Sequence, residues 1–150
     1  MSIKDLEDRI RRLEDLEAIR TLKASFGYLY DQRNWAGVSN LLADDVTGDF
    51  PMGVFEGREA VIRVMQDNVS SFSMHNHSNP VIRLDGDRAA ATWYVLTPVI
   101  DKQTNKPHWI AATYEDEYVR VERSWKFRKI CAKVIFSAPY DTGWVEKREQ

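Results

Sequence analysis

The sequence predicts an α+β fold, in which a curled antiparallel sheet wraps around a long N-terminal helix to form a cone. Three observations lead to it. Apolar residues recur every three or four positions through the first thirty residues, which is the spacing of an amphipathic helix. From residue 74 onward, four runs rich in β-branched and aromatic residues follow one another, as in an antiparallel meander. These runs are eleven to thirteen residues long, about twice the usual strand, so we expect the sheet to curl and leave an open mouth.

Length and composition limit the classes to which the chain can belong. It has 150 residues, 43% of them hydrophobic, which is enough for one domain over 1–150 with an interior that holds a pocket. A net charge of −2 excludes binding to nucleic acid or acidic membranes through bulk charge. The apolar runs are too short to span a bilayer and the first residues are too charged for a signal peptide, so we expect a cytoplasmic protein.

The first helix is predicted over about thirty residues and ends at Asp31. Its first half keeps a heptad-like spacing with charges between the apolar residues, so it could project as a coiled-coil stub or pack on a neighbouring subunit. An acidic residue is common at a helix end, although at a C-terminus it opposes the helix dipole. The apolar positions are Ile3, Leu6, Ile10, Leu13, Leu16, Ile19, Leu22, Phe26 and Leu29.

The remaining elements are separated by turn residues. A short second helix is predicted over 35–43 with Asn34 as its N-cap, and a third helix over 58–69. Two short strands, 46–50 and 54–56, flank the turn at residues 51–53. The four long strands are predicted over 74–84, 89–100, 109–121 and 125–136, and the Asp-Gly-Asp sequence at 85–87 indicates a hairpin between the first two.

Two of the three histidines, His75 and His77, lie two residues apart, so on a regular strand both point to one face. They could be half-exposed residues bonded to their neighbours, or the beginning of an imidazole metal site. A metal site needs further ligands, for which Asp31 and His108 are the candidates. We expect no bound metal, because the lone Cys131 adds no cysteine pair and is itself expected to be a small core residue.

Tyrosine hydroxyls on apolar bodies could hold a carbonyl or a water inside a pocket, or serve in packing alone. The chain contains no glycine-rich phosphate loop and no Gly-x-Ser-x-Gly motif, so nucleotide cofactors and serine hydrolase chemistry have no support. The charged residues Glu115, Asp116, Glu117, Lys129 and Lys133 are predicted to lie on solvated strand faces. The candidate tyrosines are Tyr28, Tyr30, Tyr94, Tyr114 and Tyr118.

The order of elements, together with several motifs, resembles the SnoaL-like branch of the nuclear transport factor 2-like superfamily. The matching segments are 16–23 (LEAIRTLK), Tyr30-Asp31 followed by Trp35, 73–75 (SMH), 92–94 (TWY), 114–118 (YEDEY) and 125–127 (WKF). They cover nearly the whole chain. The superfamily includes dehydratases, isomerases, cyclases, a dehydrochlorinase and proteins that only bind; the pattern is most similar to bile-acid dehydratases, and less to scytalone dehydratase and the lindane dehydrochlorinase.

The resemblance implies a catalytic pair. In those enzymes an aspartate near the end of the first helix holds a histidine that removes a proton, and Asp31 and His75 fall on these positions. Phe26 stands in place of the bile-acid enzymes' tyrosine, Thr97 in place of a further acid, and Ile130 in place of the dehydrochlorinase's basic residue. Tyr28 or Tyr30 would have to substitute for that missing tyrosine from another direction, and Tyr30 or Tyr94 could donate to the substrate carbonyl.

The resulting prediction is a cofactor-free lyase, a dehydratase for a hydrophobic hydroxy-carbonyl ring compound that is steroid-like or polyketide-like. His75 would be the general base and Asp31 would fix its tautomer. An isomerase using the same pair, or a non-catalytic binding protein, are the alternatives. The resemblance also implies a dimer or trimer. Residues expected to line the substrate site are Phe26, Tyr28, His77, Trp93, His108 and Tyr114.

Overall fold

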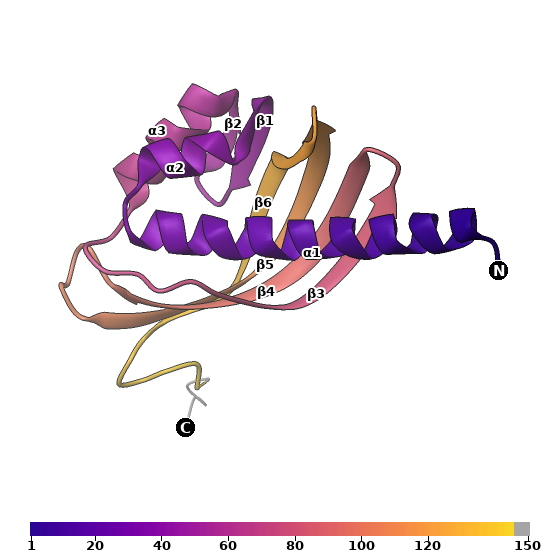
Figure 1. The fold of residues 1–150 in the computed structure, drawn as a ribbon. Helices are drawn as coiled ribbons and strands as arrows, with labels where there is room; N and C mark the ends of the chain where they lie inside the picture. Colours follow the sequence, from indigo (N-terminus) through magenta and orange to yellow (C-terminus); the bar gives the residue numbers. More distant parts are fainter. Residues whose placement is uncertain (146–150) are drawn as a thin grey trace.

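The structure, a computed structural model, describes residues 1–145 and confirms the predicted α+β class (Figure 1). The helices are α1 (Ile3–Asp31), α2 (Trp35–Asn40) and α3 (Arg58–Asn68). The strands are β1 (Leu42–Phe50), β2 (Gly53–Glu56), β3 (Asn76–Asp85), β4 (Arg88–Ile100), β5 (Pro107–Val121) and β6 (Ser124–Pro139). Over these residues, no helix is long and apolar enough to cross a membrane.

The sheet is mixed rather than purely antiparallel, which corrects one detail of the predicted fold. Its order is β2-β1-β6-β5-β4-β3, and β3 to β6 form the expected antiparallel meander. β1, however, runs parallel to β6, because the chain leaves this edge of the sheet through α3 and enters β3 at the opposite edge. Figure 1 shows the long strands curling beneath α1, with α2 and α3 beside one end of the helix.

α1 begins with a capping box, in which the Ser2 hydroxyl accepts from the backbone N–H of Asp5 and the Asp5 carboxylate accepts from that of Ser2. Its buried residues all belong to the second half of the helix, which lies against the concave face of the sheet. The N-terminal turns project beyond the sheet (Figure 1). The buried set is Ile19, Leu22, Lys23, Phe26 and Gly27.

α2 is shorter than predicted. Asn34 is its N-cap, as expected, and accepts from the backbone N–H of Gly37 at 2.9 Å. The helix was predicted to continue to residue 43, but Leu42 pairs with Phe127 as the first residue of β1. Leu42 is fully buried, so tertiary packing against β6 outweighs the helical spacing of the apolar residues.

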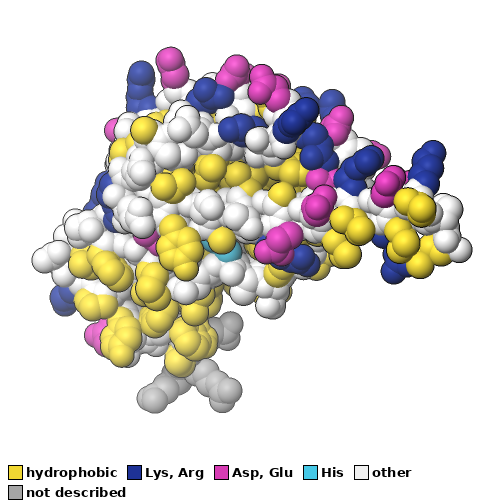
Figure 2. Space-filling model, in the orientation of Figure 1, with side chains coloured by type: hydrophobic (Ala, Val, Ile, Leu, Met, Phe, Trp, Pro, Cys, Tyr) yellow, Lys and Arg dark blue, Asp and Glu magenta, His cyan; other side chains and the backbone are white. Residues whose placement is uncertain are grey.

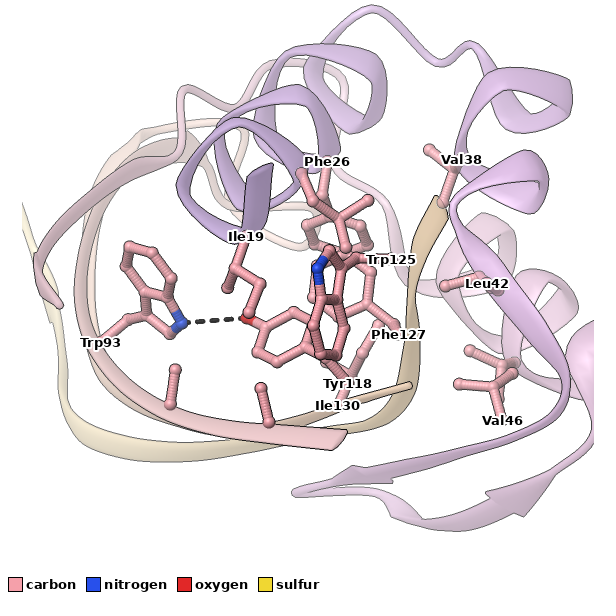
Figure 3. Close-up of a cluster of buried hydrophobic side chains, with 14 of the residues drawn as sticks. Ile19, Phe26, Val38, Leu42, Val46, Trp93, Tyr118, Trp125, Phe127 and Ile130 are labelled. Atoms are coloured by element: carbon pink, nitrogen blue, oxygen red, sulfur yellow. Dashed lines mark hydrogen bonds between the residues drawn. The ribbon is translucent and has the colours of Figure 1, made fainter. Parts of the chain in front are cut away.

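Much of the core lies between α1 and the concave face of the sheet, and Val38, Leu42 and Val46 continue it on the side of α2 and β1 (Figure 3). Residues alternate between buried and exposed along β4, so Ala89, Ala91 and Trp93 point inward. Inside the core the Trp93 indole N–H donates to the Tyr118 hydroxyl at 3.0 Å, which satisfies the buried polar atom of each ring. These side chains fill the interior of the cone from its centre to the end that lies near residue 15 of α1.

Arg120 fastens α1 to the strands at that end of the cone. Its guanidinium bonds Asp15 of α1 at 2.7 Å and Asp87 of the β3–β4 turn at 2.9 Å, and it lies 4.6 Å from the Trp125 ring centroid. The Trp125 indole N–H also donates to Asp15, at 3.0 Å. α1 is therefore fixed at residue 15 on the side that faces the sheet.

Candidate active site

Asp31 and His75, which are 44 residues apart in the chain, are brought into contact at the last residue of α1. Asp31 Oδ1 lies 2.6 Å from His75 Nδ1, and Asp31 Oδ2 accepts from the His75 backbone N–H at 2.8 Å. The two contacts fix both the position of the backbone and the plane of the ring. Because a carboxylate accepts, Nδ1 carries the proton and Nε2 is left as the basic nitrogen.

Ser73 and Arg33 hold the Asp31 carboxylate in place through a chain of hydrogen bonds. The Ser73 hydroxyl donates to Asp31 Oδ1 at 2.9 Å and accepts from the Arg33 guanidinium at 3.0 Å. Arg33, which has a φ of 60°, also donates to the carbonyl oxygens of Tyr30, Asp31 and Ser70. This single side chain thus ties the end of α1 to the segment that leads into β3.

The pKa of Asp31 lies below its usual value. Burial alone would raise it, but the hydrogen bonds from the His75 ring, the His75 backbone and the Ser73 hydroxyl outweigh burial. These donors also compensate for placing an acid at a helix C-terminus, where the dipole disfavours it. Asp31 is therefore ionised at neutral pH and able to stabilise a positive charge on the ring.

His75 borders a cavity of about 220 Å³ at the end of the cone away from the Arg120 contacts. Most of the wall is apolar, so the space suits a hydrophobic compound with few polar groups. The polar side chains of the wall are those of Tyr30, Asn68, Ser70, Ser73, His75, Thr97 and Tyr114, and the apolar ones include Phe26, Met65, Val95, Val99 and Ile110.

Two tyrosines of the wall keep their protons at neutral pH. Burial raises the pKa of Tyr30 to about 12 and also raises the pKa of Tyr114. The Tyr30 hydroxyl is 3.5 Å from the Met65 carbonyl oxygen, a long contact that a substrate oxygen could replace. The Tyr30 and His75 ring centroids are 4.9 Å apart in an edge-to-face arrangement, so the tyrosine ring packs against the base.

His77 lies behind His75. The two rings stack with centroids 5.9 Å apart, and the register shift between β3 and β4 falls between Ser78 and Val81, beyond both histidines. Burial, helped by the charge of Lys23, lowers the pKa of His77 to about 2, so the ring is neutral. Its Nε2 is buried and has no hydrogen-bond partner among the described residues.

A second buried pair, Lys23 with Asp116, was missed by the sequence reasoning. Lys23 Nζ lies 2.6 Å from Asp116 Oδ2, and both side chains are fully buried, so the prediction of a solvated Asp116 was wrong. Lys23 also lies 3.7 Å from the Tyr114 ring centroid, and the Tyr118 hydroxyl donates to Asp116 at 3.2 Å. Burial lowers the pKa of Lys23 and raises that of Asp116, against their mutual attraction.

Both residues of this pair carry a signal in the sequence. Asp116 stands two residues from Tyr114 and from Tyr118, so on a strand it shares their inward face. Lys23 follows Ile19 by four positions and precedes Phe26 by three, which places it among the core-facing residues of the helix. The charges of Glu115 and Glu117, which do point outward, obscured this alternation.

Several predicted site residues lie away from the cavity. Tyr94 is half-exposed on the outer face of β4, because the strand alternates and its neighbour Trp93 takes the inward position in the core. Tyr28 is 71% exposed on the outside of α1. His108 bonds the Ser137 hydroxyl at 2.7 Å on the neighbouring strand. The structure thus brings His75, Tyr30, Tyr114 and Phe26 together around the cavity, with Asp31 held against His75 and His77 behind it, whereas Trp93 does not line the cavity.

Comparison with known proteins assigns the family. The SnoaL-like domain family matches residues 11–130, which include most of α1, Asp31, His75 and most of the sheet. The chain belongs to the SnoaL-like family. Within residues 1–145 no group of three His, Cys, Asp or Glu side chains could hold a metal ion, and the expectation that no metal is bound stays a prediction.

Solved structures similar to this SnoaL-like protein include two dehydrochlorinases. LinA superposes with a TM-score of 0.84 at 21% identity, covering 95% of this chain and 99% of LinA. The hexachlorocyclohexane dehydrochlorinase LinA-type3 of Novosphingobium barchaimii gives 0.82 at 21%, with the same coverage. A Novosphingobium aromaticivorans protein, provisionally assigned as a scytalone dehydratase, gives 0.79 at 20% identity, covering 86% of this chain and 89% of its own. At these identities the likeness shows the nuclear transport factor 2-like fold, and the finer resemblance to bile-acid dehydratases stays a prediction.

Proposed function

We propose that this SnoaL-like protein is a cofactor-free lyase that eliminates water from a hydrophobic hydroxy-carbonyl ring compound. The 2.6 Å contact between Asp31 and His75 at the wall of an apolar cavity carries the proposal. An imidazole held by a carboxylate through Nδ1 is oriented to act as a general base through Nε2. The similar proteins named as dehydrochlorinases and as a dehydratase carry out eliminations, which supports the same reaction class here.

The elimination proceeds by proton transfer at one nitrogen. His75 Nε2 removes the proton next to the carbonyl, and the electron pair forms the enolate while the ionised Asp31 stabilises the imidazolium. The leaving hydroxyl then departs as water after taking that proton from Nε2, which requires both groups on one face of the ring. Tyr30 or Tyr114 donates to the carbonyl oxygen as negative charge develops, since both hydroxyls are protonated at neutral pH.

Water rather than chloride is the proposed leaving group. Ile130, which stands at the dehydrochlorinase's basic position, is fully buried in the core and offers no cation for a departing halide. The cavity wall contains hydroxyl and amide groups, Thr97 and Asn68 among them, which can bond a hydroxyl of the substrate.

Mass spectrometry tests this proposal directly. The protein is incubated with a panel of hydroxy-carbonyl steroids and polyketides, and the products are searched for loss of one water, with His75→Ala as the control. We expect water loss from at least one compound with the wild-type chain and none above background with the variant. Rearranged products of unchanged mass would instead identify an isomerase, and bound but unchanged compounds would identify a binding protein.

A further inference from the structure

The N-terminal half of α1 carries an apolar stripe that its own fold leaves uncovered. Residues 1–14 are all exposed, and Figure 2 shows hydrophobic side chains gathered on this projecting end. The stripe consists of Ile3, Leu6, Ile10 and Leu13, with 77, 42, 53 and 65% of their surface exposed. An isolated helix of this length is marginal in water, so a stripe of four large apolar residues needs a partner surface.

The stripe faces away from the body of the protein. At 100° per residue it lies about 180° around the helix from Asp15, which Arg120 and Trp125 hold against the strands. The stripe therefore does not continue the side of the helix that faces the core in the second half of α1. The helix has two apolar faces in succession, and the first points to solvent.

The residues of the stripe have the spacing of a two-stranded coiled coil. Numbered as a heptad, Ile3 and Ile10 occupy position a, and Leu6 and Leu13 occupy position d. β-branched residues at a with leucine at d favour a parallel pair of helices. Asp15 falls at position f, opposite the seam, so in such a pair the two bodies would lie on the outside and would not collide.

The flanking charges select the orientation. Glu7 and Glu14 occupy position e, and Arg9 occupies position g. In a parallel pair, Arg9 of each helix faces the partner's Glu14, which gives two attractive contacts by symmetry. An antiparallel pair would set glutamate against glutamate along the e positions and lose both contacts.

We propose that the N-terminal halves of α1 from two copies of this chain associate as a parallel coiled coil through Ile3, Leu6, Ile10 and Leu13. The seam spans two heptads, so the association is a concentration-dependent equilibrium between monomer and dimer. It uses a surface separate from the cavity, and it holds whether or not the proposed elimination is correct.

Sedimentation equilibrium of the full chain, from micromolar to millimolar concentration, tests the seam. We expect dimerisation that Ile10→Glu abolishes and that Glu14→Arg weakens about tenfold, because two attractive contacts become repulsive. Combining Arg9→Glu with Glu14→Arg exchanges the charges and restores the wild-type dissociation constant. Lys4→Glu, at the outward position b, is the matched control and leaves that constant unchanged.

A cysteine placed in the seam tests the orientation. In a parallel pair Leu13→Cys meets its own counterpart and forms a disulfide on oxidation, whereas in an antiparallel pair the two sulfurs are about 15 Å apart. Far-ultraviolet circular dichroism confirms that each variant is folded. A chain that is monomeric at every concentration, association unaffected by Ile10→Glu, or no cross-link through Leu13→Cys would overturn the proposal.

Discussion

Asp31 with His75 and Lys23 with Asp116 are two pairs of the same contact distance, 2.6 Å, in opposite surroundings. Each pair joins a residue of α1 to a residue in, or just before, a strand of the sheet. The first borders the cavity, with side chains 18 and 13% exposed, whereas the second is enclosed at 0% for each side chain. A short contact alone therefore does not mark a reactive group; what distinguishes Asp31 and His75 is that one nitrogen of the ring is left for a substrate.

The enclosed pair has a structural consequence instead. A charge without a partner in a protein interior is costly, so Lys23 and Asp116 can remain buried only together. Because one comes from α1 and the other from β5, they fix the helix over the sheet and, through it, the place of Asp31. If this comparison is right, changes at the first pair affect turnover and changes at the second affect stability.

The largest expected effect is that of His75→Ala on turnover. Loss of a general base lowers kcat by about 10²–10⁴. The fold should persist, because the ring borders a cavity and the Asp31 carboxylate keeps its hydrogen bonds from the backbone N–H of residue 75 and the Ser73 hydroxyl. Steady-state kinetics on the substrate identified by mass spectrometry, together with thermal unfolding, measure both quantities.

Asp31→Asn tests whether Asp31 acts through His75. The amide can donate to the wrong ring nitrogen and favour the unproductive tautomer, so turnover falls as well. Since the two residues act as a unit, the double variant should be little worse than His75→Ala alone. Strictly additive losses would show separate roles, and two single variants with wild-type turnover would contradict the catalytic assignment.

Lys23→Met should produce the largest loss of stability. It leaves Asp116 buried without its partner, which costs about 3–5 kcal/mol of the free energy of unfolding. Urea unfolding followed by fluorescence measures this loss. Combining Lys23→Met with Asp116→Leu removes both charges and should recover most of it; a double variant as unstable as the single one would show that packing, not charge, dominates at this site.

The two pairs also differ in how far the sequence could predict them. The long helix, the four long strands and the turn at residues 85–87 followed from local periodicity and turn chemistry, which adjacent residues determine. The contact of Asp31 with His75 depends on where β3 lies beside the end of α1, and spacing along the chain carries no such information. It was suggested only by the resemblance to a family.

Side chains alternate between the inner and outer faces of each strand, and this alternation predicts which residues point inward. On β4 it places Trp93 inward and Tyr94 outward, and on β5 it places Asp116 inward between two exposed glutamates. The parallel pairing of β1 with β6 has no local signal, because it depends on which edge strand the chain reaches after α3. Periodicity thus predicted the elements, while tertiary packing decided which side chains share the site.

His77 should have a smaller effect than Lys23, and this effect concerns how the free energy of unfolding depends on pH. Its pKa is about 2 in the folded protein and 6.5 when exposed, so between these values the unfolded chain binds a proton that the folded chain does not. Above about pH 6.5 the ring is neutral in both states and does not change the free energy of unfolding. Below that pH the free energy of unfolding falls, because only the unfolded chain takes up the proton. Between pH 7.5 and 5 this amounts to about 2 kcal/mol.

His77→Leu should remove that pH dependence. The ring nitrogen Nε2 has no partner within the described residues, so an apolar side chain of similar size sacrifices no hydrogen bond there. Urea unfolding at the two pH values measures the difference for the wild-type chain and for the variant. Equal pH dependence in the two would contradict the assignment of His77 as a neutral residue whose ring nitrogen is buried.

The smallest effect tests how Asp31 is held, through Ser73→Ala. Loss of the Ser73 hydroxyl removes one of the donors that lower the pKa of Asp31, so that pKa should rise toward its usual value. We expect kcat to fall about tenfold, since a hydrogen bond to a charged group is lost, with KM little changed. Arg33→Ala should add an increase in KM, because Arg33 also fixes Ser70, which lines the cavity. A variant that unfolds at lower temperature but keeps the wild-type kcat would show that Ser73 supports the fold alone, whereas a lower kcat at unchanged thermal stability would show that the hydroxyl acts through the carboxylate that holds the base.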